Sequence, residues 1–405
     1  MRILVAHNRY RSAAPSGENR VVDQESEALL SLGHDVVRFE RESDSIEDWS
    51  PLQKATLPAR VIWNPTTRRD LLRVLQQFKP DVVHIHNTFP LLSPSVLYAC
   101  RDERVPVVVT VHNYKLLCAS GDFFRSGAVC RDCAGGASMP ALVHRCYRRS
   151  AIATVPPVVA ARAHRRAWKH FVSAYIFISE SVRRLLAGME LDPERVFVKH
   201  NLVPLAGIGG LQPHEQQSQP QVAYVGRLDE AKGIPLLLRA WDRYLATTGN
   251  GPLRLAIAGS GPLESQVTNW AADRPSVELA GHLNKQDCFN LIARSRAVLL
   301  PSQWEETFGL VVVEAMAAGV APIASSHGSF PELITDGVDG VLFNAGDSDD
   351  LARVIIDVET NDARFAAYGV QARMTYEQQH DPRRNIDQLL DIYRFAMAKP
   401  VVASP

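Results

Sequence analysis

Two basic residues in the second half of the chain are spaced as an anion site would need them. Arg227 and Lys232 lie in the segment G-R-L-D-E-A-K-G, which follows an apolar run and precedes an amphipathic one. Loop amides and the dipole at the start of a helix favour an anion, and the two side chains add a planar fork and a point charge. The set suits a diphosphate. The alternative is a solvated turn with two surface cations, because a short motif by itself is a weak signal.

A glycine-rich turn follows further along, in A-G-S-G-P-L-E from Ala258 to Glu264. It lacks the third glycine of a dinucleotide-binding loop, since Glu264 stands in that place and Pro262 lies where the helix would begin. The pattern therefore argues against NAD. Gly261 would still let the backbone come close to the base or ribose of a nucleotide, and a plain turn between strand and helix is the alternative.

Two carboxylates stand eight residues apart in W-E-E-T-F-G-L-V-V-V-E-A-M-A-A-G, a segment that otherwise looks like a buried helix. The charge of Glu306 or Glu314 would be costly to bury without a partner. We expect a loop over residues 302–308 and a helix over 310–318. This arrangement places Glu306 at the positive end of the helix and Glu314 about one and a half turns inside it.

Both carboxylates would then be placed to accept hydrogen bonds from sugar hydroxyls. Glu306 would take those of a hexose and Glu314 the two of a ribose. The backbone amides of Phe308, Gly309 and Leu310 would meet the phosphates between them. The alternative is that Glu306 caps the helix and Glu314 forms a salt bridge with a core arginine.

Short apolar runs that alternate with amphipathic stretches must position these segments. The expected strands are, in chain order, 2–6, 35–39, 81–85, 106–111, 174–178, 196–199, 221–225, 253–258, 276–279, 297–300, 321–324 and 340–343. Several of these runs are apolar on both faces, as strands of a parallel sheet covered by helices must be. The alternation predicts an α/β chain with two Rossmann-like, doubly wound domains.

A segment rich in Gly, Pro and Gln divides the chain at residues 204–220 and is expected to be a linker. The first domain is expected over 1–203, with a cysteine-containing insertion over 113–150, and the second over 221–380. A last helix, over 381–405, is expected to cross back to the first domain. Since ligands of such sheets bind beyond the carboxyl ends of the strands, we expect the site in a cleft between the domains.

The three segments described first, in this order and spacing, resemble the retaining glycosyltransferases of family 4, which have the GT-B fold. The E-x7-E pair of that family falls on Glu306 and Glu314. The resemblance continues in P-I-A-S-S-H-G-S-F-P-E-L-I and D-G-V-D-G-V-L-F, and upstream in P-D-V-V-H-I-H-N, so that it covers most of the chain. It implies a GT-B architecture with an acceptor-side domain first and a nucleotide-sugar donor domain second.

The resemblance also implies roles for single residues. The basic pair, Arg227 and Lys232, would hold the donor diphosphate, the first glutamate would meet the sugar and the second the ribose. His112, at the end of the run V-V-V-T-V, would lie against the donor sugar; by itself, a histidine at a strand end is more often a structural hydrogen-bonding group. Gly17 would let the backbone approach the diphosphate or the acceptor, although Ser16 stands where the family commonly has a second glycine.

The expected activity is that of a retaining hexosyltransferase that moves a sugar from a nucleotide-diphosphate sugar to a glycan or lipid-linked acceptor, in the synthesis of cell-surface polysaccharide or glycoconjugates. No catalytic metal and no strong protein base are expected, because the leaving phosphate oxygen can take the proton of the incoming hydroxyl. The expected catalytic residues, His112, Arg227, Lys232 and Glu306, would act chiefly by stabilising charge. The alternatives are a sugar-nucleotide epimerase, a phosphorylase, or a catalytically silent partner that binds nucleotide sugar.

Four of the six cysteines cluster in the insertion. Cys118, Cys130, Cys133 and Cys146 have the spacing C-x11-C-x2-C-x12-C, and a C-x-x-C pair with flanking cysteines suits tetrahedral Zn²⁺. Three interpretations stay open: a structural zinc site, reduced and partly buried thiols, or a disulfide, which a cytosol would disfavour.

Seven Arg or Lys residues and no acid lie in the segment 144–170. The Pro-Pro pair at 156–157 would open a helix within it. Four basic residues would fall on one face of that helix: Arg162, Arg165, Arg166 and Lys169. One interpretation is a solvated basic face; the other is a patch for anionic lipid headgroups or a lipid-linked diphosphate acceptor.

Bulk composition limits the remaining classes. Lys plus Arg and Asp plus Glu number 44 each, so no global field argues for nucleic acid. The opening run M-R-I-L-V-A is too short for the apolar region of a signal peptide, and no apolar run approaches the roughly 18 residues that span a bilayer. We therefore expect a cytoplasmic protein, with attachment to the inner face of the membrane through the basic segment left open.

Overall fold

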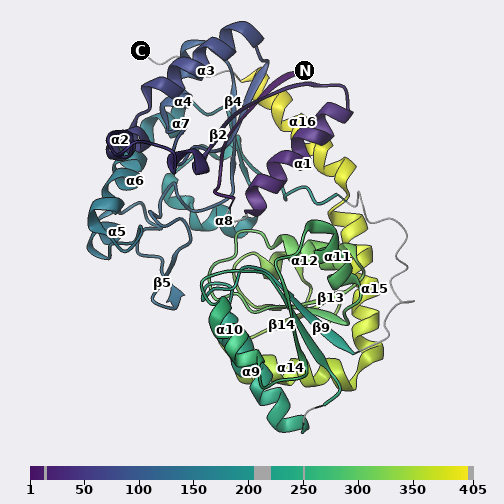
Figure 1. The fold of residues 1–405 in the computed structure, drawn as a ribbon. Coiled ribbons are helices and arrows are strands. Elements are labelled where there is room, and N and C mark those ends of the chain that lie inside the picture. Colours follow the sequence, from purple (N-terminus) through teal and green to yellow (C-terminus); the bar gives the residue numbers. More distant parts are fainter. Residues whose placement is uncertain (13–15, 205–219, 250, 400–405) are drawn as a thin grey trace. The chain divides into compact units, whose positions relative to one another are not determined.

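The computed structural model describes residues 1–12, 16–204, 220–249 and 251–399 (Figure 1). The expected linker therefore lies almost wholly outside the described residues. The chain forms two compact units, each with its own six-stranded sheet. The first unit comprises Met1–Phe123, Cys130–Leu202 and the chain from Arg383, and the second comprises Phe124–Val129 and Val203–Pro382.

The first unit contains a parallel sheet with the strand order β2-β1-β3-β4-β7-β8. Its strands are β1 (Arg2–Arg9), β2 (Asp35–Glu42), β3 (Val82–Asn87), β4 (Val107–Val111), β7 (Ala174–Phe177) and β8 (Val196–Val198). Every residue of β3 and β4 is buried, as expected for central strands covered on both faces.

Helices cover both faces of this sheet (Figure 1). α1 (Gly17–Ser31) and α16 (Pro382–Ala398) share a core with β1, β3, β4 and β7, to which Val22 and Leu29 of α1 and Leu389 and Tyr393 of α16 contribute. The remaining helices of the unit are α2 (Pro51–Ile62), α3 (Pro65–Phe78), α4 (Ser95–Asp102), α5 (Met139–Val143), α6 (Ala151–Ala163), α7 (Arg165–His170) and α8 (Glu180–Leu185). A two-stranded hairpin, β5 (Phe124–Arg125) and β6 (Ala128–Val129), lies within the expected insertion.

The second unit repeats the plan with the strand order β11-β10-β9-β12-β13-β14, again parallel. The strands are β9 (Gln221–Val225), β10 (Arg254–Ala258), β11 (Val277–Gly281), β12 (Ala297–Leu300), β13 (Ala321–Ser325) and β14 (Val341–Phe343). The helices are α9 (Ile234–Thr248), α10 (Glu264–Ala271), α11 (Lys285–Ala293), α12 (Leu310–Ala317), α13 (Phe330–Leu333), α14 (Ser348–Thr360) and α15 (Asp362–Gln379). α9 and α14 bury one core against the sheet. The α/β prediction of two doubly wound sheets is confirmed.

The expected strands each overlap an observed one, and their ends differ by at most three residues. The largest differences, three residues each, are at β2, which continues to Glu42, and at β1, which continues to Arg9 although the apolar run ends at Ala6. His7 and Asn8 extend it because both are fully buried and hydrogen bonded, His7 to Asn19 and Asn8 to Ser43. Polar residues at a strand end thus hid the last part of the strand from the hydrophobic pattern.

The prediction for the basic segment was wrong. The Pro-Pro pair lies inside α6 instead of opening a helix, because Ser150 caps α6 upstream and accepts a hydrogen bond from the amide of Ala153. α6 ends at Ala163, and α7 begins as a separate helix at Arg165. The four basic residues are therefore divided between two helices and do not form one helical face.

Candidate functional site

Three loops of the second unit meet beyond the carboxyl ends of β10, β9 and β12, which are neighbours in the sheet. The amide of Leu228 donates to the carbonyl of Ser260 (2.9 Å), and the amide of Gln303 donates to the carbonyl of Ala231 (2.7 Å). Backbone hydrogen bonds thus hold together the three segments that were distinct in the sequence.

Glycine permits this close contact at two positions. Gly233 precedes α9 with φ +78°, and a Cβ there would lie 1.7 Å from the carbonyl oxygen of Pro301. A Cβ on Gly261 would lie 2.5 Å from the carbonyl oxygen of Leu228. Both distances are far below van der Waals contact, so a larger residue at either position would force the loops apart.

Glu306 lies in the loop before α12 and is bound on three sides. The ammonium group of Lys232 is 2.9 Å from both carboxylate oxygens. The hydroxyl of Ser302 (3.0 Å) and the indole N–H of Trp304 (2.8 Å) donate to Oε2. The side chain does not cap α12. The sequence pattern did not identify Ser302 and Trp304, and nothing in their types marks them as partners of this carboxylate.

The charge state of Glu306 follows from these contacts. Burial by itself would raise the pKa of this carboxyl, but the charge of Lys232 and the hydrogen bonds from Lys232, Trp304 and Ser302 outweigh it, so the pKa lies below its usual value. Glu306 is therefore an ionised carboxylate at neutral pH. Its oxygens are strong hydrogen-bond acceptors. Its partner Lys232 also lies over the ring of Trp304, 5.2 Å from the ring centre.

Arg227 is the more exposed of the two cations, with 56% of its side chain accessible to solvent. Its Nε pairs with Asp229, whose other oxygen accepts a hydrogen bond from the backbone amide of Lys232 (2.8 Å). One carboxylate thus orients both basic residues of the loop. The guanidinium terminus is left at the surface, where it can bind an anion.

The start of α12 is formed by Gly309, which has φ +88° and precedes the first helical residue, Leu310, without a side-chain cap. Such a terminus carries the positive end of the helix dipole. The side chain of Phe308 is buried, so only its backbone is available for contact with a ligand. Glu314 lies within α12 and is half-buried.

In the first unit, Gly17 and His112 each lie just beyond the carboxyl end of a strand, after β1 and β4 respectively, and β3 separates these two strands in the sheet. Gly17 is the first residue of α1, which Ser16 caps by accepting a hydrogen bond from the amide of Glu18 (3.2 Å). His112 directly follows β4 and is buried, and its Nε2 is 2.9 Å from Nδ1 of His86. The histidine expected at the site is thus hydrogen bonded to a second histidine.

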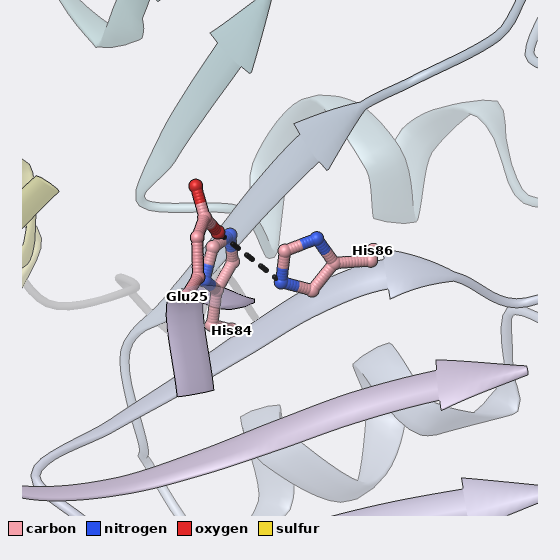
Figure 2. A group of neighbouring side chains, drawn as sticks. All are labelled: Glu25, His84 and His86. Carbon is pink, nitrogen blue, oxygen red and sulfur yellow. Dashed lines mark ion pairs between the residues drawn. The ribbon is translucent and has the colours of Figure 1, made fainter. Parts of the chain in front are cut away.

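Glu25, His84 and His86 form a buried group that the sequence interpretation missed (Figure 2). His84 and His86 are two apart on β3 and so share one face of the sheet. Lys199, which follows β8, donates to Glu25 (2.7 Å) although 174 residues separate them. The alternation H-I-H in the strand could have indicated the histidine pair. No sequence pattern indicated its partner Glu25 on α1.

Glu18, in the first turn of α1, is a second buried carboxyl that the sequence interpretation missed. Its Oε2 accepts hydrogen bonds from the hydroxyl of Tyr10 (3.1 Å) and from the amide group of Asn113 (3.3 Å). Burial raises its pKa to about 8 despite these hydrogen bonds. A large fraction of Glu18 is therefore protonated at neutral pH, so this carboxyl can donate as well as accept a hydrogen bond.

The four clustered cysteines all lie in the first unit, with Cys118 and Cys133 buried and the other two half-buried. Burial raises the pKa of Cys133 to about 11, with further contributions from the three other thiols. Within the described ranges, the only group of three or more potential ligands whose donor atoms lie within 4.8 Å of one another is Glu25, His84 and His86. The other three thiols are thus electrostatically coupled to Cys133, but no three of the four sulfur atoms lie within this distance of one another.

The surface around α5 and α6 combines arginines with exposed apolar residues. Five large hydrophobic side chains are exposed there: Met139, Val143, Ile152, Val155 and Val159. Arg165 (3.1 Å) and Lys169 (2.7 Å) of α7 are instead paired with Glu190. Among the helices that the structure describes, none has the length and apolar character needed to cross a bilayer.

Comparison with known families gives matches over both parts of the chain. Residues 15–206 match the family described as Glycosyltransferase Family 4, and residues 212–377 match Glycosyl transferases group 1.

Two curated relatives illustrate the similarity. The chain is 28% identical to D-inositol 3-phosphate glycosyltransferase of Nocardioides sp. over 246 residues, which are 54% of this chain and 52% of that protein. It is 25% identical to phosphatidyl-myo-inositol mannosyltransferase of Mycolicibacterium smegmatis over 381 residues, which are 90% of this chain and 86% of that protein. The chain spans about half the length of the first of these relatives.

A solved structure shares the architecture. Anabaena Alr3699/HepE in complex with UDP and glucose superposes with a TM-score of 0.67 and 17% identity, covering 96% of this chain and 98% of that chain. At this level of identity the likeness concerns the fold alone.

Proposed function

Since the chain belongs to the family 4 glycosyltransferases and has the GT-B fold, we propose that it moves a sugar from a nucleotide-diphosphate donor to a hydroxyl acceptor, with retention of configuration. One observation carries the proposal. A buried carboxylate, Glu306, pairs with Lys232 at the start of α12, in a loop cluster that also exposes Arg227. Two cations and a helix N-terminus suit a diphosphate, and the carboxylate suits the hydroxyls of its sugar.

In this proposal the donor is held mainly by the second unit. Arg227 and Lys232 bind the diphosphate and stabilise the charge that grows on it as the glycosidic bond breaks. The backbone amides of Phe308, Gly309 and Leu310 meet the same phosphates. Glu306 accepts hydroxyls of the sugar, and Glu314 accepts those of the ribose.

Three further residues complete the proposed site. Gly261 lets the backbone come close to the nucleoside, because it has no side chain. Gly17 lets the backbone come close to the diphosphate or the acceptor for the same reason. His112 contacts the donor sugar through a ring nitrogen.

Retention requires the acceptor oxygen to arrive on the face from which the diphosphate departs. The bond between the anomeric carbon and the phosphate oxygen breaks, and its electron pair stays on the diphosphate. The acceptor oxygen forms the new bond and passes its proton to the leaving phosphate oxygen. The chain therefore needs no strong base, and its cations stabilise the leaving group instead.

The acceptor class is proposed from the names of the relatives. One relative is named for inositol 3-phosphate and the other for phosphatidyl-myo-inositol. These names support an acceptor hydroxyl on an inositol head group, free in the first case and lipid-linked in the second. A glycan acceptor and a cell-surface product are proposed from the motif resemblance alone.

Acceptor-dependent release of nucleoside diphosphate tests the proposed function. A panel of nucleotide sugars is first screened by thermal shift, since a donor that binds only the folded state raises the melting temperature. The matched donor should then release free nucleoside diphosphate only when an acceptor is added. An epimerase would convert the donor sugar without release, a phosphorylase would require inorganic phosphate, and a silent partner would bind without turnover. Any of these three results would contradict the proposal.

We also propose that the surface of α5 and α6 binds anionic membranes, placing the protein on the inner face of the membrane. Exposed aliphatic side chains beside arginines support this, because apolar area and charge act together in binding anionic lipid.

Flotation with vesicles that contain anionic lipid checks the membrane proposal. Arg148 and Arg149 are exposed in the segment between α5 and α6. Ile152→Ser combined with Val159→Ser, and separately Arg148→Glu combined with Arg149→Glu, should each lower the bound fraction several-fold. Val370→Ser removes an exposed apolar side chain from α15 in the second unit and should bind as the parent does. Unchanged flotation of both double variants would show that this surface is not the lipid contact.

A structural zinc ion at Cys118, Cys130, Cys133 and Cys146 is also proposed. It is supported by the C-x2-C pair with its flanking cysteines and by the electrostatic coupling of the other three thiols to Cys133. Binding would draw the four sulfur atoms closer together than they lie in this structure. Elemental analysis of the purified protein should find about one zinc per chain, and Cys130→Ser with Cys133→Ser should abolish it. Cys288→Ser, outside the cluster, should retain zinc. A zinc-free wild type with four titratable thiols would refute the site.

A further inference from the structure

A chain of buried polar groups connects Lys199 to His112 through the interior of the first unit. The ammonium of Lys199 donates to Oε1 of Glu25 (2.7 Å), and Oε2 of Glu25 lies 4.0 Å from Nε2 of His86. Nδ1 of His86 is in turn 2.9 Å from Nε2 of His112. Figure 2 shows the glutamate and the ring of His86 facing each other above β3.

The contacts of this group suit a chain of polar contacts, in which one link is 4.0 Å long, better than a metal centre. Both ring nitrogens of His84 are already bonded, Nδ1 to the hydroxyl of Tyr393 and Nε2 to that of Thr110, each at 2.7 Å. The ammonium of Lys199 occupies the cation position beside Glu25. A metal ion would have to displace the ammonium group of Lys199 and break two hydrogen bonds. The properties of the group therefore depend on which of its nitrogen atoms carry protons.

His84, His86 and His112 are neutral at neutral pH. Burial lowers the pKa of His84 to about 3, and burial together with neighbouring positive charge holds the pKa of His86 and His112 well below the usual value. A neutral imidazole carries one N–H and one lone pair. The direction of each hydrogen bond therefore defines the tautomer of each ring.

Glu25 determines that direction. Its Oε2 is buried and, among the described residues, has no hydrogen-bond partner, while Nε2 of His86 is the ring atom that faces it. A carboxylate only accepts, so the proton of His86 belongs on Nε2. Nδ1 of His86 then carries the lone pair and accepts from Nε2–H of His112. Nδ1 of His112 is left as an acceptor.

We propose that Glu25 and His86 are positioning residues, which hold His112 in its Nε2–H tautomer so that Nδ1 accepts a hydrogen bond from a hydroxyl of the donor sugar. This inference rests on the proposed function, in which His112 contacts that sugar. The ring would then select a hydroxyl that donates, and Glu25 would influence sugar binding without touching the sugar.

The variant Glu25→Gln is expected to reverse the tautomers. The amide oxygen of the new side chain would accept from Lys199, as Oε1 of Glu25 does, which turns the NH₂ group toward His86. His86 would then need its lone pair on Nε2 and its proton on Nδ1. His112 would accept at Nε2 and carry its proton on Nδ1.

The tautomers are measured by NMR of protein with ¹³C- and ¹⁵N-labelled histidine, in which the ring shifts distinguish Nε2–H from Nδ1–H. The signal of His112 is identified by its loss in His112→Asn. Wild type should show Nε2–H at His112, and Glu25→Gln should show Nδ1–H. Glu27→Gln removes the same charge from an exposed position of α1 and should leave the tautomer unchanged. An Nδ1–H tautomer in wild type overturns the proposal whether or not the variant folds.

Transfer assays connect the tautomer to function. Glu25→Gln should lower kcat/KM for the donor about 10-fold, the usual scale for one misdirected hydrogen bond, and Glu27→Gln should not change it. A reversed tautomer with unchanged kcat/KM would exclude a positioning role. Since the NMR measurement needs no substrate, a failure of the proposed function would appear instead as absent transfer in wild type.

Discussion

Replacing Glu306 by glutamine is expected to lower sugar transfer by about 100-fold or more while the protein stays folded. Glutamine keeps the shape of the side chain and one acceptor oxygen for Ser302 and Trp304. It removes the negative charge and the second acceptor oxygen, which the sugar hydroxyls are proposed to need. Steady-state kinetics with the matched donor, together with a thermal melt, measures both effects.

A matched control separates this effect from a general loss of charge. Glu278→Gln alters an exposed glutamate on the edge strand β11, outside the loop cluster, and should leave transfer unchanged. Near-normal turnover of Glu306→Gln would disprove the role of this carboxylate. A large drop in melting temperature would instead assign it a structural role.

Replacing Lys232 by methionine is expected to destabilise the protein by about 2–3 kcal/mol at neutral pH, and to abolish most of the transfer. Removing one partner of a buried ion pair leaves the other charge desolvated, which costs about 3–5 kcal/mol when both are fully buried. The smaller value is expected because 27% of the Lys232 side chain is exposed. Chemical denaturation across a range of pH measures the loss.

The pH dependence identifies the cause. In wild type the pKa of Glu306 is lowered, so the stability that this group contributes is present above the ordinary pKa of glutamate and is lost as pH falls through the lowered value. Without Lys232 the pKa of the buried carboxyl should rise. The stability difference between wild type and Lys232→Met should therefore shrink as the pH falls and Glu306 takes up a proton.

A double variant provides the control. Lys232→Met with Glu306→Gln removes both charges and should recover most of the lost stability, while transfer stays low. A stability difference that does not vary with pH, or a double variant no more stable than Lys232→Met, would show that the ion pair is not the source of the loss.

Much of the fold could be predicted from the sequence because the relevant patterns are local. Runs such as Val107–Val111 are apolar on both faces, and this property alone marks a central parallel strand. The basic segment was misjudged because two competing local signals were present. The cap at Ser150 determined where α6 begins, and the proline pair was accommodated within it.

The candidate site was predictable only in part. Loops that follow neighbouring parallel strands must emerge at the same edge, so the approach of residues 226–233 to the segment before α12 was implied by the strand pattern. The strand pattern did not indicate the partner of Glu306. Lys232 is 74 residues away, and the bond between them depends on two glycine-dependent backbone contacts.

The sequence by itself determined two doubly wound sheets, the order of their loops and the family, because hydrophobic period and motif spacing are properties of short segments. Only the tertiary structure decided which polar groups meet. The negative charge of Glu306 is balanced by an ion pair with Lys232, and that of Glu25 by an ion pair with Lys199, which is 174 residues away in the sequence. The tautomer proposed for His112 depends on the same kind of contact, since a hydrogen bond is defined by separations near 3 Å between elements that no local pattern relates.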